Sequence, residues 1–160
     1  MIKRLPFATI LAAAAMIAQQ PNGAGINPPW PAAEAIHPED LARQIQNKEN
    51  APAVFHVGFA ALYKSKHVPG AVYAGPGSKE DGLADLKKAV ADVSKDRQII
   101  LYCGCCPWDH CPNMKPAYSL LHSLGYTKIK VVEIPNNFVK DWVDKGLPFE
   151  SAHASSSPER

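Results

Sequence analysis

The chain has 160 residues, enough for one domain of ordinary size with a normal hydrophobic core. Its 17 basic and 15 acidic side chains nearly cancel, so it lacks the strong positive charge typical of nucleic-acid-binding proteins. The formal excess of +2 comes from Lys3 and Arg4, without which 15 basic residues balance 15 acidic ones. We therefore expect no nucleic-acid partner.

The amino-terminal segment has the pattern of a secretory signal peptide. Lys3 and Arg4 give a charged start, residues 5–18 are largely apolar, and the polar Gln19 follows. No apolar run approaches the roughly 20 residues that a membrane-spanning helix needs. The sequence thus predicts a signal peptide at 1–18, membrane contact only through this segment before cleavage, and a periplasmic or secreted protein.

The segments that flank the central part of the chain have a different composition. Residues 19–32 are rich in proline, glycine and asparagine, which predicts a flexible linker. Residues 151–160 predict a disordered tail. The folded domain is therefore expected at 33–150.

In the first half of this domain, apolar runs alternate with helical patterns. Pro38 and the acidic residues after it predict the start of a helix. Short strands are expected at 53–57 and 71–73. Ser78 and Asp81 then have the spacing of a capping box, which predicts that the next helix begins there.

The second half continues the alternation. Residues 98–102 form the most apolar run and are expected to be the central strand, and a helix with a buried apolar stripe follows and ends at Gly125. Residues 128–134 predict a strand whose charged residues indicate an exposed side or end, and 137–145 predict a last helix. The predicted fold class is α/β: a single domain with a central parallel sheet flanked by helices on both faces.

All the cysteines of the chain fall in one short segment between the central strand and the next helix. They are Cys103, Cys105, Cys106 and Cys111. A disulfide stabilises a protein mainly by closing a long loop in the unfolded chain, and a bridge within this segment would close almost nothing. Open α/β sheets bind their ligands at the carboxyl ends of the strands. The placement of the cysteines therefore favours sulfur or metal chemistry.

Four stretches of the domain occur in the order and spacing of the motifs of a known family. They are Ile36-His-Pro-Glu-Asp-Leu41, His67-Val-Pro-Gly-Ala71, Ile99-Ile-Leu-Tyr-Cys103, and Asn137-Phe-Val-Lys-Asp-Trp142 with the later Gly146-Leu-Pro148. Together they resemble the rhodanese-like sulfurtransferase domains, whose signature His-Ile-Pro-Gly-Ala is similar to the second stretch. The resemblance implies a rhodanese-like fold over 33–150.

The chain also departs from the family pattern. The family's aspartate on the second strand matches His56, and its Gly-Gly before the closing phenylalanine matches Asn136 and Asn137, a mild change because asparagine tolerates a left-handed backbone. The loop after Cys103 is longer than in typical members and carries three further cysteines.

The resemblance implies that Cys103 is the catalytic nucleophile and holds sulfane sulfur as a persulfide. The donor would be thiosulfate or a persulfide, the acceptor a thiol, including a protein thiol, or cyanide, and no cofactor is required. A free thiol has a pKa of about 8.5, so the thiolate must be stabilised. Pro107 and Pro112 have no N–H group to donate to it. A domain that keeps the fold and has lost this chemistry is the alternative.

The other cysteines admit three roles. Cys105, Cys106 or Cys111 could act as a resolving or relay thiol for Cys103, as in a thiol-disulfide redox protein. Alternatively, Cys103, Cys106, Cys111 and His110 could bind a soft metal ion such as zinc or copper. The third role is an inert disulfide in an oxidising compartment. The sequence does not distinguish these roles.

Several side chains near the cysteines have a functional and a structural interpretation of comparable weight. Lys115 is expected either to attract an anionic donor or to be a solvated lysine, and Trp108 either to form a wall of the substrate pocket or to pack on the domain surface. His67 and His56 are expected to be structural, and the helical spacing of Phe138 and Trp142 predicts that both are core residues.

Overall fold

The computed structural model describes residues 28–152 of the chain. The predicted signal peptide at 1–18 lies outside the described residues, as do most of the predicted linker and tail. Within the described range, no helix has both the length and the apolar character needed to cross a membrane.

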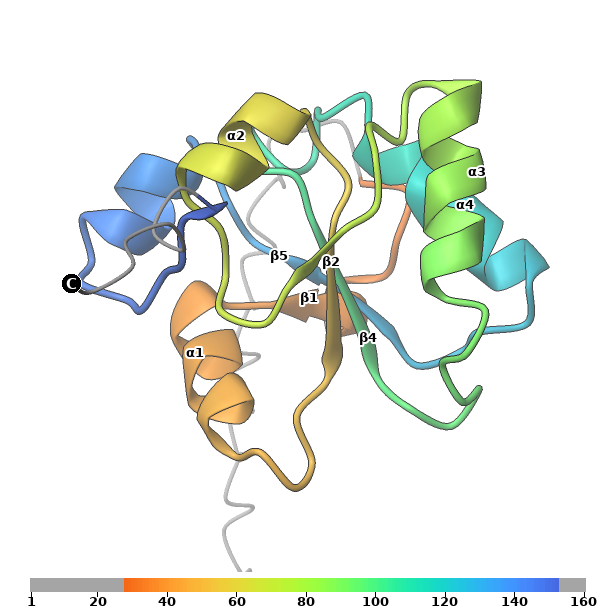
Figure 1. Cartoon of the computed structure of the whole chain (residues 1–160), viewed down its shortest axis with the longest axis horizontal. Coiled ribbons are helices and arrows are strands. Elements are labelled where there is room, and N and C mark those ends of the chain that lie inside the picture. Colours follow the sequence, from red (N-terminus) through yellow and green to blue (C-terminus); the bar gives the residue numbers. More distant parts are fainter. Residues whose placement is uncertain (1–27, 153–160) are drawn as a thin grey trace, which may run out of the picture.

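Five parallel strands form one sheet in the order β1-β5-β4-β2-β3 (Figure 1). The strands are β1 (Ala35–Ile36), β2 (Ala53–His56), β3 (Val72–Tyr73), β4 (Ile99–Tyr102) and β5 (Ile129–Val132). The central strand is β4, and all its residues are buried. A parallel sheet with helices on both faces buries its central strands completely, which requires nearly continuous apolar sequences. The parallel sheet and its buried central strand confirm the predicted α/β class.

Helices cover both faces of the sheet (Figure 1). The core on one face joins β4 to α1 (Pro38–Gln46) and to the π-helical turn η2 (Val139–Val143). The core on the other face joins it to α3 (Glu80–Ala89) and α4 (Met114–Ser123). Two short elements complete the fold, the 3-10 helix η1 (Ala32–Glu34) and α2 (Ala60–Ser65).

Two local predictions are wrong, and a third holds in part. The capping box does not form, because α3 begins at Glu80 without a side-chain cap and the Ser78 N–H donates to Asn113 instead. The strand β5 is not exposed at its side, since it pairs with β1 and β4 and three of its four residues are buried, but Lys128 directly before it is exposed. The last helix is shorter than 137–145 and is π-helical.

The turn before η2 is held by a side chain. Asn136 and Asn137 do not adopt the left-handed backbone, since positive φ angles in residues 28–152 occur only at glycines. Their N–H groups donate to the Asp141 carboxylate at 2.7 and 3.0 Å. The buried Asp141 therefore supplies the acceptor that holds this turn.

The folded domain begins earlier than residue 33. Trp30 falls in the predicted linker, yet its side chain is buried and packs against Trp108 and Tyr118, with ring centroids 5.6 and 5.5 Å apart. Burial of a large aromatic side chain contributes substantially to stability. The segment from Trp30 onward is therefore part of the domain.

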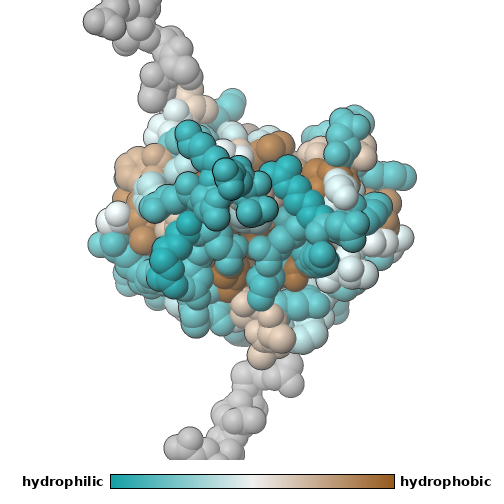
Figure 2. All heavy atoms as spheres, turned by 90° about the horizontal axis from the view of Figure 1, so that it is seen from below, coloured by the Kyte–Doolittle hydropathy of each residue, from teal (hydrophilic) through white to brown (hydrophobic). Residues whose placement is uncertain are grey.

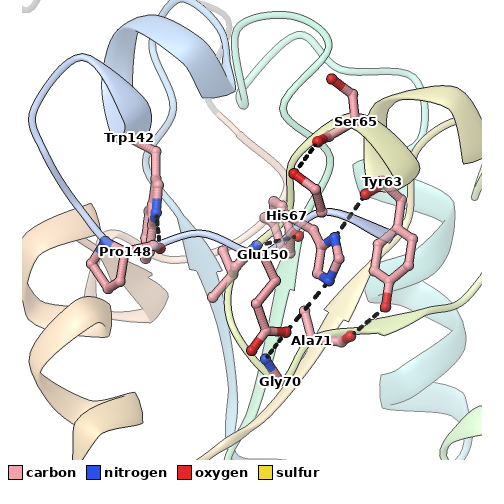
Figure 3. A network of polar contacts seen from close by, with 11 residues as sticks. Tyr63, Ser65, His67, Gly70, Ala71, Trp142, Pro148 and Glu150 are labelled. Carbon is pink, nitrogen blue, oxygen red and sulfur yellow. Dashed lines mark hydrogen bonds and ion pairs between the residues drawn. The ribbon is translucent and has the colours of Figure 1, made fainter. Parts of the chain in front are cut away.

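The carboxyl-terminal segment is attached through His67, as Figure 3 shows. His67 and Glu150 exchange two backbone hydrogen bonds of 2.8 and 2.9 Å, and the Glu150 carboxylate accepts the Gly70 N–H. The His67 ring contacts the Tyr63 carbonyl through Nδ1 at 2.7 Å. Its two ring nitrogens thus face Tyr63 and Glu150, which confirms the structural interpretation of His67.

The two ends of the sheet differ in character. The loops that precede β2 and β4 lie at the lower end in Figure 1, and Figure 2 shows this end covered mainly by hydrophilic residues. The loop that carries the cysteines lies at the opposite end, after the carboxyl end of β4. Ligands of open α/β sheets bind at that end.

Candidate functional site

Cys103 directly follows the central strand and is buried. The ladder between β2 and β4 continues beyond β2, because the Val57 N–H donates to the Tyr102 carbonyl at 2.9 Å. This pairing brings Gly58 against the Cys103 side chain, where an added Cβ would lie 2.9 Å from the Cys103 sulfur. A glycine at 58 therefore leaves the space that the sulfur occupies.

The chain turns sharply after Cys103. Gly104 has a φ of 76°, in the left-handed region that favours glycine. Its carbonyl accepts the Phe138 N–H at 3.0 Å, and an added Cβ would lie 2.8 Å from the Phe138 Cβ. Glycine at 104 thus allows the loop to reverse against the segment that enters η2.

The reversal brings the cysteine sulfurs together. The Cys105 Sγ lies 3.1 Å from that of Cys103, 3.0 Å from that of Cys106 and 3.8 Å from that of Cys111. All are free thiols, of which Cys103 and Cys111 are buried and Cys105 and Cys106 half-buried. The loop therefore forms a compact sulfur cluster above the carboxyl end of β4.

The middle of the loop is held against the domain by Trp108. Its backbone N–H donates to the Ile134 carbonyl at 2.9 Å, and its ring packs on Trp30. The ring also contacts the apolar cores on both faces of the sheet. Of the two interpretations of Trp108, the structure therefore favours packing on the domain surface. The pocket that Trp108 lines contains no cysteine.

Asn113 is a site residue that the sequence analysis did not single out. Its side chain is fully buried, the Nδ2 amide donates to the Cys103 sulfur at 3.3 Å, and the Oδ1 atom accepts the Ser78 N–H at 3.0 Å. Because the second bond fixes the amide orientation, the N–H group must face the sulfur. A hydrogen bond to the charged form of an acid favours ionisation, so Asn113 stabilises a Cys103 thiolate.

We expect Asn113→Asp to raise the pKa of Cys103 from about 6 by at least about one unit, which slows its alkylation by at least about twofold at pH 7 and by about tenfold or more at pH 5. The carboxylate has the size of the amide and still accepts the Ser78 N–H, but it replaces the donor with a negative charge. The measurement is the pH profile of Cys103 alkylation by iodoacetamide, located by peptide fragmentation. Asn50→Asp makes the same charge change at an exposed position and should leave the profile unchanged. Equal profiles for both variants would contradict the role of Asn113.

The cluster holds its negative charge on Cys103. Interaction with the Cys111 thiol, followed by that with Cys105 and Asn113, lowers the pKa of Cys103 to about 6 against the opposing effect of burial. The pKa of Cys111 is raised by its interaction with Cys103 and by burial. Burial and the neighbouring thiols raise the pKa of Cys105. At neutral pH the Cys103 thiolate therefore lies beside the protonated thiols of Cys105 and Cys111.

Lys115 and His110 lie on the outer side of the cluster. Both line a hollow of about 490 Å³ that also contains Cys111, but not Cys103. The His110 side chain is 49% exposed, and its Nδ1 atom lies 2.8 Å from the Asp109 carboxylate. Lys115 is exposed and therefore available to an anion approaching Cys111.

The structure does not bring the four predicted metal ligands together as one group. The side chains whose ligand atoms all lie within 4.8 Å of one another are Cys103, Cys105 and Cys111. Cys106 and His110 do not belong to this group. The reason is the turn at Gly104, which places Cys105 between the other two sulfurs.

His56 is a buried core histidine, as expected. Burial lowers its pKa to about 4, against the opposing effect of a hydrogen bond to the Cys103 backbone. Its Nδ1 atom faces the Gly58 N–H at 3.4 Å. The ring is thus neutral at physiological pH and supports the backbone on which Cys103 is held.

Comparison with known proteins gives one family and one fold. The family model of the Rhodanese-like domain matches residues 37–134, more than half of the chain. A solved Bacillus halodurans protein is 23% identical, with 78% of this chain and 81% of that one covered and a TM-score of 0.58. The Rhodanese-like domain of an Anabaena protein is 20% identical, with 79% and 86% covered and a TM-score of 0.54.

A thiosulfate sulfurtransferase from Pseudomonas aeruginosa is 16% identical, with a TM-score of 0.54. The match covers 74% of this chain and 20% of the longer Pseudomonas chain. At these identities the solved structures show a shared fold. No curated protein sequence matches the chain.

Proposed function

The chain belongs to the rhodanese-like domain family, and we propose that it is a sulfurtransferase that carries sulfane sulfur as a persulfide on Cys103. The observation that carries this proposal is the environment of the Cys103 sulfur. The thiol is held at the carboxyl end of the central strand, beside the buried Asn113 amide and two further thiols. This environment supports a nucleophilic thiolate at neutral pH.

In the loading step, the Cys103 thiolate attacks the outer sulfur of thiosulfate. A new S–S bond forms as the S–S bond of thiosulfate breaks, and sulfite leaves with the electron pair of that bond. In the transfer step, an acceptor thiolate or cyanide attacks the terminal sulfur and Cys103 leaves as the thiolate. The sulfur atom that the donor gives up is taken by the acceptor, and Cys103 returns to the thiolate without net oxidation or reduction. The cycle therefore needs no cofactor.

The neighbouring side chains would stabilise the negative charges of the Cys103 thiolate and of an anionic sulfur donor. The Asn113 amide is placed to stabilise the thiolate that attacks and later leaves. Protonated Cys105 and Cys111 are hydrogen-bond donors, a role that backbone N–H groups cannot take at Pro107 and Pro112. Lys115 offers a positive charge near the outer side of the cluster, where an anionic donor would approach.

The test is exposure of the reduced, metal-free protein to thiosulfate. We expect the intact mass to increase by one sulfur atom per chain while one sulfite is released, and cyanide to remove the added sulfur as thiocyanate. A protein that gains no sulfur from thiosulfate or from a small persulfide would contradict the proposal.

The rate of sulfur loading should depend on pH in a defined direction. Because the pKa of Cys103 is lowered to about 6, the thiolate predominates above this pH and is lost as pH falls through it. We expect initial loading rates to be nearly constant between about pH 7 and pH 8 and to fall by about tenfold per pH unit below about pH 5.5. A rate that instead rises steadily up to about pH 8.5 would indicate an ordinary thiol.

A further inference from the structure

We propose that Cys103, Cys105 and Cys111 form a three-thiolate site for a soft monovalent metal ion, Cu(I), and that metal and sulfane sulfur compete for Cys103. Each of the three sulfurs lies within 4.8 Å of the other two. Among the described residues, no other set of three or more potential ligand side chains converges in this way. Metal binding at this site does not depend on sulfurtransferase activity.

The spacing of the sulfurs suits a three-coordinate ion. Metal–thiolate bonds are about 2.3 Å long, so three sulfurs in a plane around one ion lie about 4 Å apart. The Cys105 and Cys111 sulfurs are already 3.8 Å apart, whereas Cys105 and Cys103 are at 3.1 Å and must separate by about 1 Å. The half-buried Cys105 follows Gly104 and is the side chain with room to move.

The type of donor atoms selects the metal. The site offers only sulfur, because the ring of His110 faces Asp109 and is half exposed. Thiolates are soft ligands that favour Cu(I) and zinc over calcium, magnesium or manganese. Structural zinc sites take four ligands around one ion. Here three sulfurs are all within 4.8 Å of one another, and the fourth, that of Cys106, is close to Cys105 at 3.0 Å but outside this group. A three-sulfur site therefore fits Cu(I) better than zinc.

The loop geometry keeps this site partly shielded. Cys103 and Cys111 are buried, and the ring of Trp108 fixes the intervening chain on Trp30. Entry is available on the side of Cys111, which lines the hollow of about 490 Å³ beside Lys115. Binding releases the protons of Cys105 and Cys111, and the resulting metal–sulfur bonds occupy the Cys103 lone pair needed for attack on a sulfur donor.

The experiment is an anaerobic titration of the reduced full chain with Cu(I), delivered as its complex with the chromophoric chelator bicinchoninate. We expect one Cu(I) per chain, three sulfur neighbours by X-ray absorption, and loss of sulfur loading from thiosulfate in the metal-bound protein. Zinc presented alone should bind at least about tenfold more weakly.

Serine variants test whether the three sulfurs act as one metal site. Cys105→Ser and Cys111→Ser should each weaken Cu(I) binding by at least about tenfold. Cys106→Ser is the matched control, since it removes a thiol from the same loop that lies outside the group of three. It should retain full Cu(I) affinity.

Three results would overturn the proposal: no Cu(I) retained against the chelator, tighter binding of zinc with four sulfur neighbours, or equal loss of affinity in Cys106→Ser and Cys105→Ser. Circular dichroism of each variant reports whether it folds, and the half-buried Cys105 provides a variant that does not alter the core. If Cu(I) binds but the metal-free protein gains no sulfur from thiosulfate, the Cu(I) site is supported and the proposed sulfurtransferase activity is contradicted.

Discussion

Cys103→Ser is expected to abolish sulfur loading and to leave the fold intact. Serine differs little from cysteine in size, so the buried position beside Gly58 still accommodates it. An alcohol cannot supply the thiolate that attacks the donor or hold the persulfide that results. The measurement is intact mass after exposure to thiosulfate, together with sulfite release, which should fall to the level of the protein-free reaction.

The other cysteines provide the matched controls for this variant. Cys106→Ser should gain one sulfur as the unmodified chain does, because Cys106 lies outside the group of three sulfurs. Cys105→Ser and Cys111→Ser should also retain the added sulfur, since a serine hydroxyl can still donate a hydrogen bond to Cys103. The assignment of the nucleophile is abandoned if Cys103→Ser gains one sulfur as readily as the unmodified chain.

The sheet could be predicted because burial on both faces leaves a strong signal. Every residue of β4 is apolar or aromatic and buried, and the spacing of Phe138 and Trp142 placed both in the core correctly. The helix α2 was not predicted, and it has no buried residue. Without a buried face, a short helix has no apolar period for sequence analysis to detect.

The position of the candidate site could be predicted from the sequence, but which cysteine sulfurs come together could not. The run from Cys103 to Cys111 predicted chemistry at the end of the central strand, and the cysteine sulfurs lie close together there. Which sulfurs meet depends on the left-handed turn at Gly104 and on the packing of Trp108 against Trp30. Neither contact follows from the spacing of the cysteines.

Asn113 shows a further limit of local reasoning. A polar residue directly before a helix is normally interpreted as a cap, yet its side chain makes no capping hydrogen bond to α4. It joins Ser78 to Cys103, residues that are distant in sequence and adjacent only in the fold. The bond to Ser78 also explains why the predicted capping box of α3 does not form.

Trp142→Ala is expected to reduce the free energy of unfolding by about 3–5 kcal/mol, because truncating a large core aromatic loses transfer free energy and leaves a cavity. The Trp142 side chain is fully buried and stacks on Phe138 at a centroid distance of 5.7 Å. Its indole N–H donates to the Pro148 carbonyl at 2.7 Å, as Figure 3 shows, so the change also releases the segment that leads to Glu150. Urea denaturation followed by circular dichroism measures the effect.

Val139→Ala is the matched control, since Val139 lies in the same π-helical turn and is 49% exposed. Its cost should stay within about 0.5 kcal/mol, the range typical of surface substitutions. Cys111→Ser should also cost far less than Trp142→Ala, because it leaves almost no cavity. The opposite result would be a domain that unfolds in Cys111→Ser and tolerates Trp142→Ala. It would mean that the sulfur cluster, as a structural metal or disulfide site, contributes more to the free energy of unfolding than the core around η2 does.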